Sequence, residues 1–227
     1  MKRSNIIRPA VFAFLLSIAG AGFARGEEPK RTEYWYQRSS LFEVLDIMPD
    51  DIVFFGNSIT DGAELQELLG MPNVKNRGIV GDNVSGLIER VHQVTKGHPK
   101  KIFILIGCND ISQDQTIEEI TTNYRTLLRK IQQDSPESKI YIQSVMPINN
   151  DFGRYKTLFG KEHLIPELNE ELVKIAKEFN ITYIDVQPPL ADPESGKLKK
   201  EYTPDGIHLM GPAYQEWIEV LRPYVME

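Results

Sequence analysis

Four short segments of the chain place polar residues directly after apolar runs. Ser58 follows "DIVFF" in "GNSITDG", Gly81 begins "GDN", and Asn109 lies in "GCND". Asp205 and His208 stand three positions apart in "TPDGIH", near the end of the sequence. Acyl transfer through a covalent intermediate needs these residue types, because it uses a hydroxyl nucleophile, an imidazole base, an orienting carboxylate and hydrogen-bond donors for an oxyanion.

Each of these residues has a specific use in such chemistry. A serine is a weak nucleophile until a histidine takes its proton, so we predict Ser58 as the nucleophile and His208 as its base. An aspartate three residues before a histidine, on a turn, can set its carboxylate against one ring nitrogen, which is the role predicted for Asp205. The predicted oxyanion hole consists of the Ser58 N–H, the Gly81 N–H and the Asn109 side-chain amide.

Taken singly, the segments also have structural explanations. "GNS" forms an ordinary turn, "DGIH" is a helix start capped by Asp205, and "GCND" is a strand-to-helix loop capped by Asn109 or Asp110. Cys108 is interpreted as a small buried filler, since no neighbour in the sequence would lower the pKa of its thiol. These explanations do not account for all four segments at one edge of one sheet, and the combination favours catalysis.

Apolar runs rich in β-branched and aromatic residues predict the elements that carry these segments. Predicted strands cover residues 52–56, 74–80, 101–107, 139–147 and 181–186. Predicted helices cover residues 84–94, 117–131, 164–179 and 211–225, the middle two with apolar stripes that face a core. Strand alternating with helix indicates an α/β fold with a parallel sheet of about five strands and helices on both faces. Ligands bind such sheets beyond the carboxyl ends of the strands, where the four segments fall.

The start of the chain has the pattern of a secretory signal. Basic residues among the first eight precede an uncharged run over 9–24 that ends in small residues. The run is shorter than the roughly 20 residues of a spanning helix, which argues against the alternative of a membrane anchor. We predict cleavage near Ala24 and an exported protein, periplasmic or secreted. An aromatic lead-in over 25–48 then precedes a single catalytic domain over 49–227, and we expect the lead-in to pack on that domain rather than to bind a partner.

Composition excludes several classes of function. The formal net charge of the chain is −6, and loss of Lys2, Arg3 and Arg8 with the signal would make it −9. So acidic a protein lacks the electrostatic footprint for nucleic acid or an anionic membrane, and we expect no stable membrane insertion. One cysteine allows no internal disulfide, and four histidines without ligand spacing indicate no structural zinc site. We expect neither a metal nor another cofactor.

The four segments resemble the sequence blocks of the SGNH hydrolases, also called the GDSL esterase/lipase family. Ser58 in "FFGNSITDG", Gly81 in "NRGIVGDN" and Asn109 in "LIGCND" match the first three blocks, and Asp205 with His208 in "TPDGIHLMGPAY" matches the last. The blocks occur in order, and the resemblance spans about residues 50–215. It implies a flavodoxin-like three-layer α/β/α sandwich, the SGNH hydrolase fold, and metal-free ester hydrolysis through a covalent acyl-enzyme.

The first block departs from the family pattern, because Asn57 stands where the family name expects an aspartate. We expect this change to tune activity rather than abolish it, with the Asn57 amide bracing the turn. The long segment 147–163 is the predicted rim of the site. Asn149, Arg154 and Tyr155 in this segment, together with Asn57, are predicted to contact substrate, since amide, guanidinium and aromatic side chains suit a sugar.

The residues within the blocks resemble those of exported bacterial carbohydrate O-acetylesterases, including sialate O-acetylesterase-like proteins. They also resemble those of platelet-activating-factor acetylhydrolase-type enzymes. Both imply a short acyl group, and export with an acidic surface favours a deacetylase that acts on small-molecule or glycan esters. A lysophospholipase or thioesterase is the enzymatic alternative. A non-catalytic glycan-binding protein on this fold would be expected to lack a triad member, and none is missing here. A flavin- or nucleotide-binding protein would need a glycine-rich phosphate loop after the first strand, and this sequence has none there. The sugar, its hydroxyl position and the oligomeric state stay open.

Overall fold

The computed structural model describes residues 31–227, which form one compact unit. The predicted signal peptide, with its cleavage position, lies outside the described residues. The part of the predicted lead-in from residue 31 onward belongs to the same unit as the predicted catalytic domain. None of the helices in residues 31–227 combines the length and the apolar character that crossing a bilayer requires.

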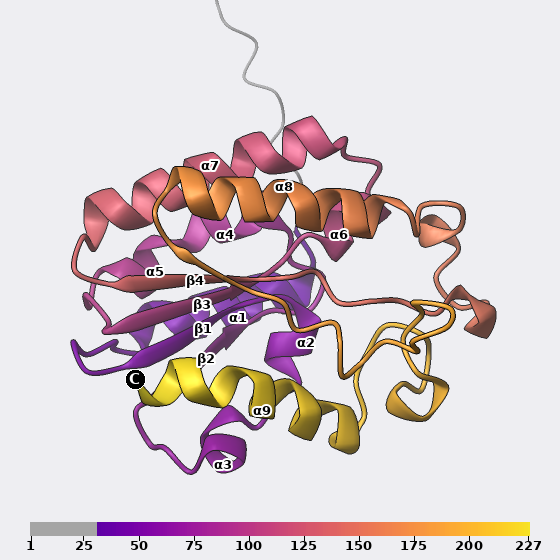
Figure 1. Cartoon of the computed structure of the whole chain (residues 1–227). Helices are drawn as coiled ribbons and strands as arrows, with labels where there is room; N and C mark the ends of the chain where they lie inside the picture. The colour runs from indigo at the N-terminus through magenta and orange to yellow at the C-terminus, as the bar shows by residue number, and fades with distance from the viewer. Residues whose placement is uncertain (1–30) are drawn as a thin grey trace, which may run out of the picture. The chain divides into compact units, whose positions relative to one another are not determined.

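A five-stranded parallel sheet lies between two layers of helices (Figure 1). The strands, in their order across the sheet, are β2 (Val74–Gly78), β1 (Ile52–Gly56), β3 (Lys101–Leu105), β4 (Lys139–Gln143) and β5 (Thr182–Ile184). Every residue of β1 and β3 is buried, as expected of continuous apolar strands covered on both faces. The chain adds β2 on one side of β1 and then crosses to β3 on the other, so the topological switch point lies between β1 and β3.

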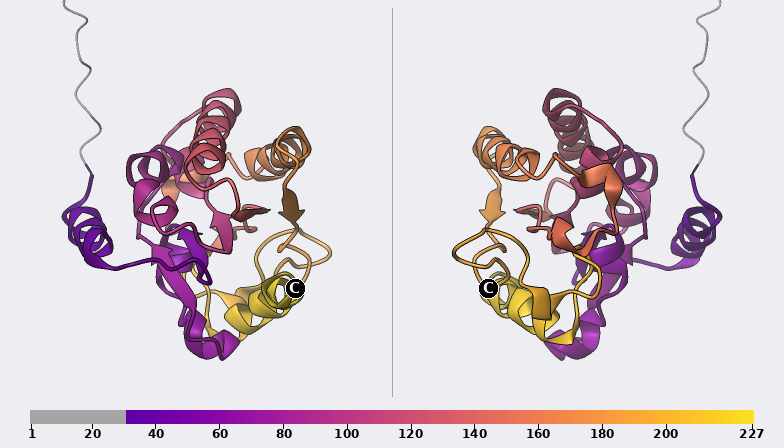
Figure 2. Two further views of the ribbon diagram at one scale, coloured as in Figure 1. Left: turned by 90° about the vertical axis from the view of Figure 1, so that its left-hand side faces the viewer. Right: turned by 90° about the vertical axis from the view of Figure 1, so that its right-hand side faces the viewer.

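Helices cover both faces of this sheet (Figures 1 and 2). One face packs against α4 (Val84–Arg90), α5 (His92–Thr95), α7 (Ile117–Asp134) and α8 (Leu164–Glu178). The opposite face packs against α3 (Leu65–Leu69) and α9 (Gly211–Met226). The apolar stripe predicted on α7 is buried along its length, from Ile120 to Ile131. The predicted three-layer α/β/α fold is therefore confirmed.

Short helices form in segments where the sequence predicts turns and loops. The helices α2 (Ser58–Asp61) and α6 (Cys108–Ser112) directly follow β1 and β3, and short 3₁₀ helices cover Asn150–Phe152, Lys156–Leu158 and Lys200–Tyr202. The predicted strand 139–147 ends at Gln143, although residues 144–149 are also buried. These apolar residues extended the predicted strand because periodicity reports burial, and here burial continues beyond the sheet.

The helix α1 (Glu33–Val44) was not predicted as a helix, and it packs on the domain through its aromatic residues. Trp35 and Phe42 are buried and form a small cluster with Ile79, which follows β2. The guanidinium groups of Arg38 and Arg77 lie over the Phe42 ring, 4.8 and 4.9 Å from its centroid. Arg38 lies in α1 itself, whereas Arg77 lies in β2, so the Arg77 cation–π contact joins the aromatic helix to the sheet.

Candidate active site

Ser58, His208 and Asp205 form one hydrogen-bonded series at the carboxyl edge of the sheet. Nε2 of His208 lies 3.0 Å from Oγ of Ser58, and Nδ1 of His208 lies 2.7 Å from Oδ2 of Asp205. Ser58 is the first residue of α2, so the end of β1 delivers its hydroxyl to this edge. The side chains of His208 and Asp205 are 34% and 13% exposed, so the imidazole is open to a ligand while the carboxylate lies behind it.

The turn that carries Asp205 and His208 is held by local hydrogen bonds. Oδ1 of Asp205 accepts from the backbone N–H groups of Ile207 at 3.0 Å and His208 at 2.9 Å. Oγ1 of Thr203 accepts from the N–H of Gly206 at 2.8 Å. Gly206 has φ +96°, and a Cβ atom there would lie 2.2 Å from the Asn149 carbonyl oxygen, so the position requires glycine. The turn thus holds the carboxylate against the imidazole.

These hydrogen bonds also determine the charge of Asp205. Partial burial acts to raise the pKa of the carboxyl group. Hydrogen bonds from the His208 side chain and from the backbone N–H groups of His208 and Ile207 outweigh burial and lower the pKa to about 2. The carboxylate therefore stays ionised at neutral pH, and its hydrogen bond favours the imidazole tautomer with the proton on Nδ1.

The predicted oxyanion donors come from the loops that follow β1, β2 and β3. The N–H of Ser58 is the first of α2 and has no acceptor within that helix. Gly81 is exposed and has φ +77°, a left-handed conformation that favours glycine. Nδ2 of Asn109 donates to the carbonyl oxygen of Asp82 at 2.8 Å, which fixes the orientation of the amide and leaves its second hydrogen for another acceptor.

A buried ion pair supports this side of the site. Nε of Arg90 lies 2.8 Å from Oδ2 of Asp82, and the two side chains are 1% and 0% exposed. Arg90 also donates to the carbonyl oxygen of Gly56 at 3.1 Å, and Nε1 of Trp35 donates to Oδ1 of Asp82 at 3.0 Å. The pair therefore connects the end of β1, the loop after β2 and α1.

Sequence reasoning assigned no role to this ion pair. Asp82 was quoted only as part of "GDN", and Arg90 lay within a predicted helix. A weak signal was available, because Arg90 lies three residues after Leu87 and next to Val91, two buried positions of the apolar face. A charged residue so placed on a helix face predicts a buried partner.

Asp110 is a second buried carboxylate, which the sequence predicts only as a possible helix cap. It is completely buried, and its two oxygens lie 3.0 and 3.3 Å from the N–H of Val84, the first residue of α4. Burial is the largest influence and raises the pKa of Asp110 to about 7, although hydrogen bonds to backbone N–H groups oppose it. Asp110 thus links the Asn109 segment to the helix after "GDN". Within residues 31–227, no group of three or more His, Cys, Asp or Glu side chains is placed to hold a metal ion.

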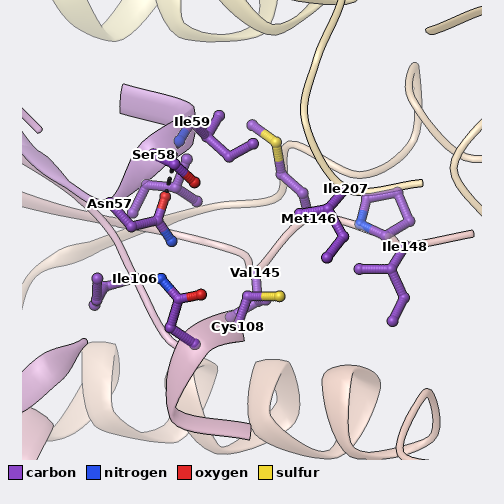
Figure 3. A pocket seen from close by; sticks show the side chains of 12 residues that line it. Asn57, Ser58, Ile59, Ile106, Cys108, Val145, Met146, Ile148 and Ile207 are labelled. Carbon is purple, nitrogen blue, oxygen red and sulfur yellow. Dashed lines mark hydrogen bonds between the residues drawn. The ribbon is translucent and has the colours of Figure 1, made fainter. Parts of the chain in front are cut away.

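A narrow apolar pocket opens beside Ser58 (Figure 3). In Figure 3, Asn57 and Ser58 lie on one side of the pocket, and Val145 and Ile148 lie across from them. The space open to the centre of a water-sized sphere is about 20 Å³. The remaining lining residues are Ile59, Leu105, Ile106, Cys108, Asn109, Met146, Pro147 and Ile207. The pocket therefore has room for a very small apolar group.

Cys108 contributes to the lining of this pocket as a half-buried side chain. Burial raises the pKa of its thiol to about 12, and the nearby Asp110 charge acts in the same direction. A thiol is reactive only as its thiolate, so this cysteine is inert near neutral pH. The sequence predicted a small buried filler, whereas Cys108 is half-buried and lines the pocket beside Ser58.

The four residues predicted to contact substrate have different surroundings. Asn57 lines the pocket, and its Oδ1 accepts from the N–H of Ile59 at 3.1 Å, so its oxygen caps α2. Asn149 is buried, and its Nδ2 donates to the Leu198 carbonyl oxygen at 2.8 Å, so it is a structural residue rather than the predicted substrate contact.

The other two lie on the loop after Asn149. Arg154 is exposed and does not line the pocket at Ser58. Tyr155 does not line that pocket either, because its hydroxyl points to the acid–base pair and donates to Oδ2 of Asp205 at 3.0 Å. The contact of Tyr155 with Asp205 was not predicted, and its contact with a sugar stays a prediction.

Several solved structures resemble this one. A candidate platelet activating factor from Streptococcus pneumoniae has 29% identity and a TM-score of 0.75, over 85% of this chain and 91% of that one. A GDSL-like lipase from Bacteroides thetaiotaomicron has 20% identity and a TM-score of 0.73, over 84% and 96% of the two chains. An acetylxylan esterase from Geobacillus stearothermophilus has 17% identity and a TM-score of 0.64, over 81% and 97%. No curated protein matches the chain.

The family follows from the sequence profile that matches the chain. The GDSL-like Lipase/Acylhydrolase family matches residues 54–216, which is most of the chain and includes all four sequence blocks. The fold agrees with that of the solved relatives. The chain therefore belongs to the GDSL-like lipase/acylhydrolase family, the SGNH hydrolases, and is a carboxylic ester hydrolase.

Proposed function

We propose that this enzyme hydrolyses short acyl esters through a serine nucleophile, with O-acetyl groups of carbohydrates as its substrates. The observation that carries the proposal is the series of two contacts, Ser58 Oγ to His208 Nε2 at 3.0 Å and His208 Nδ1 to Asp205 Oδ2 at 2.7 Å. A hydroxyl with a base in reach, and a base oriented by a carboxylate, is the arrangement that activates serine.

In the first half-reaction, Oγ of Ser58 attacks the ester carbonyl carbon while its proton passes to Nε2 of His208. The carbonyl oxygen becomes an oxyanion, which accepts hydrogen bonds from the Ser58 and Gly81 N–H groups and the Asn109 amide. Asp205 stabilises the imidazolium that has formed. The bond to the leaving alcohol then breaks, His208 gives the alcohol its proton, and an acyl-serine remains.

In the second half-reaction, water takes the place of the alcohol. His208 removes a proton from the water as its oxygen attacks the acyl-serine carbonyl carbon, and the same donors hold the second oxyanion. The bond to Oγ breaks, Ser58 recovers its proton from His208, and the carboxylic acid leaves. The residues return to their starting protonation states, and no cofactor is required.

The pocket beside Ser58 supports a short acyl group. Its free space of about 20 Å³ exceeds the volume that one water needs by only a small margin. Aliphatic side chains such as Val145 and Ile148 line it, which suits a methyl group better than a charged or hydrogen-bonding one. A long acyl chain would require these side chains to move.

A larger depression next to this pocket supports a polar alcohol. It has about 500 Å³ of space open to a water-sized sphere, and it shares Pro147 and Ile148 with the acyl pocket. Volumes of this order accommodate ligands well above the size of an acetyl group. Its polar lining comprises Asn150, Glu162, His163, Gln187, Ser195 and Lys197, which offer donors and acceptors to sugar hydroxyls.

One prediction and one structural likeness are compatible with a glycan substrate. Export, predicted from residues 1–24, would bring the enzyme to extracellular polysaccharides. An acetylxylan esterase from Geobacillus stearothermophilus is built on the same fold, so this fold accommodates chemistry on an acetylated glycan.

Hydrolysis of p-nitrophenyl esters from acetate to octanoate tests the proposal, with Ser58→Ala as the control. We expect the highest kcat/KM for acetate and loss of activity in the variant. Ile148→Ala widens the acyl pocket and is expected to shift the preference to longer chains. A rise of kcat/KM with chain length in the wild-type enzyme would instead favour a lysophospholipase or thioesterase.

The alcohol side is tested with an acetylated xylo-oligosaccharide and ethyl acetate, which present the same acyl group on a large and a small alcohol. A higher kcat/KM for the sugar ester supports a carbohydrate substrate, and equal values contradict it. Labelling of Ser58 by a fluorophosphonate separates an enzyme from a non-catalytic glycan-binding protein, since only an activated serine reacts.

A further inference from the structure

The loop between β4 and α8 sends one side chain to the acid–base pair. The hydroxyl of Tyr155 donates to Oδ2 of Asp205 at 3.0 Å, and its oxygen lies 3.2 Å from Nδ1 of His208. The Tyr155 and His208 rings meet edge to face, with centroids 5.9 Å apart and an interplanar angle of 65°. Oδ2 of Asp205 thus accepts hydrogen bonds from both the His208 imidazole and the Tyr155 hydroxyl.

We propose that Tyr155 is a positioning residue of the acid–base pair, whose hydroxyl holds the Asp205 carboxylate in the orientation that His208 requires. This inference rests on the serine mechanism proposed above. Asp205 Oδ1 is already held by two backbone N–H groups, at 2.9 and 3.0 Å. Tyr155 donates to the other oxygen, Oδ2, from outside the turn. Oδ2 therefore has a donor besides His208 itself.

The loop that carries Tyr155 is anchored to the opposite side of the site. Oγ1 of Thr157 lies 2.7 Å from Oγ of Ser112, and Nζ of Lys161 donates to the carbonyl oxygen of Ile111 at 3.1 Å. Ser112 and Ile111 belong to α6, the helix that also contains Asn109. Tyr155 therefore sits on a bridge between the helix of a predicted oxyanion donor and the acid–base turn.

The ionisable groups around the imidazole allow the sign of the effect to be derived. Asp205 faces His208 from its own turn, Tyr155 from the loop with Arg154 nearby, and the Ser58 hydroxyl from α2. The hydroxyl of Tyr155 donates to the carboxylate and so offsets part of its negative charge. Without the hydroxyl, more of that charge acts on His208, which favours the imidazolium. The acidic limb of the rate profile should then move to higher pH.

Tyr155→Phe keeps the ring and removes only the hydroxyl. We expect kcat on p-nitrophenyl acetate to fall by about 10- to 150-fold, the effect of losing one hydrogen bond to a charged group. KM should change little, because Tyr155 does not line the acyl pocket. The acidic limb of kcat/KM should move to higher pH. An unmoved limb, a limb at lower pH, or an increase in KM alone would overturn the proposal, and the last would indicate a substrate contact instead.

Tyr141→Phe is the matched control. It also removes a tyrosine hydroxyl that donates to a carboxylate, that of Glu227, but this contact lies near the chain terminus, away from the helices α2 and α6 (Figure 1). We expect unchanged kcat, KM and pH profile in this variant. Equal effects of the two substitutions would mean that a general loss of stability explains both, and the positioning role would be wrong.

A second readout separates this proposal from the serine mechanism. The imidazole signals of His208 can be followed by NMR against pH in the wild-type protein and in Tyr155→Phe, without any substrate. A higher titration midpoint in the variant supports the positioning role, and identical curves overturn it. Absence of ester hydrolysis and of fluorophosphonate labelling in the wild-type protein would refute the serine mechanism, while this titration would still decide whether Tyr155 acts on the pair.

Discussion

The two sides of the site are held by different physical means. The acid–base turn is held by hydrogen bonds between residues close in the sequence, at a partly exposed position. Asp205 accepts from the backbone N–H groups of Ile207 and His208, two and three residues later in the chain. The oxyanion side rests on fully buried groups, the Asp82–Arg90 pair and Asp110, which connect segments distant in the sequence. The turn is thus specified locally, whereas the oxyanion side depends on the completed fold.

The carboxylates of Asp205 and Asp110 show what this difference does to charge. Both are subject to burial, which raises the pKa of an acid. Among the donors to Asp205, the imidazole and two backbone N–H groups lower its pKa to about 2, and the Tyr155 hydroxyl also donates to it. Asp110 is more deeply buried and has only backbone N–H donors, and its pKa rises to about 7. The depth of burial, together with the number and kind of donors, decides which acid is a permanent anion.

The largest effect is expected for Asp205→Asn, which replaces the permanent anion with a neutral amide. The amide can no longer stabilise the imidazolium and can hold the wrong imidazole tautomer, so kcat should fall by about 10⁴-fold. The rate of p-nitrophenyl acetate hydrolysis measures it, with circular dichroism as the check of folding. A folded variant that keeps a tenth of the wild-type kcat, or about that, would contradict the role of Asp205.

The buried ion pair should matter for stability. Arg90→Met leaves Asp82 buried without its cation, and we expect the free energy of unfolding to fall by about 3–5 kcal/mol. Arg222→Met is the control, since the Arg222–Glu219 pair is exposed and should contribute no more than about 1 kcal/mol. Urea unfolding followed by fluorescence compares the two. Similar losses would show that burial does not distinguish the two pairs.

Asn109→Ala removes the predicted oxyanion donor and leaves its buried neighbour Asp110 in place. Loss of one oxyanion donor should reduce kcat by about 10²- to 10³-fold, or about 3–4 kcal/mol, with little change in KM. Steady-state kinetics on p-nitrophenyl acetate give both constants. A fall of less than about fivefold would remove Asn109 from the oxyanion hole.

Asp110→Asn should change the pH dependence of stability. The carboxyl pKa is about 7 in the folded protein against an ordinary value of 3.8, so between these pH values the folded state binds more protons than the unfolded chain. The contribution of Asp110 is therefore complete below about pH 4 and is lost as pH rises through about 7. Relative to the variant, the wild-type protein should lose on the order of 4 kcal/mol between these limits.

Urea unfolding of the wild-type protein and Asp110→Asn at pH 4, 6 and 8 measures this difference. Taking the difference between the two proteins removes the contributions of other titrating groups. Curves of unfolding free energy that run parallel across the range would mean that the Asp110 carboxyl group titrates normally.

Much of the fold was predictable from the sequence because its elements are encoded locally. The strand 52–56 and the helices near 117–134 and 164–178 follow from apolar periodicity, which each segment carries by itself. The helix α1 was missed because its apolar residues have no helical stripe, and its buried Phe42 ring meets Arg77 of β2, which is distant in the sequence. The predicted strand 139–147 was too long because burial alone cannot distinguish a strand from a buried loop.

The site was predictable to the extent that its residues lie in short motifs. Asp205 and His208 meet because they are neighbours on one turn, and that contact follows from a three-residue spacing. Tyr155 and Asn149 were assigned to substrate from residue type alone, but the fold places the first on Asp205 and buries the second. Residue type shows what a side chain can bind, and the neighbours that it meets decide what it does bind.

The sequence by itself determined the α/β class of this protein, its hydrolase family and the local acid–base turn, since these depend on periodicity and on residues close along the chain. Only the tertiary structure decided that Ser58 meets His208 across 150 positions, that Arg90 is buried against Asp82, and that Tyr155 reaches Asp205. The physical reason is that such contacts depend on strand order and loop path. Packing of the whole domain selects these, and no short segment encodes them.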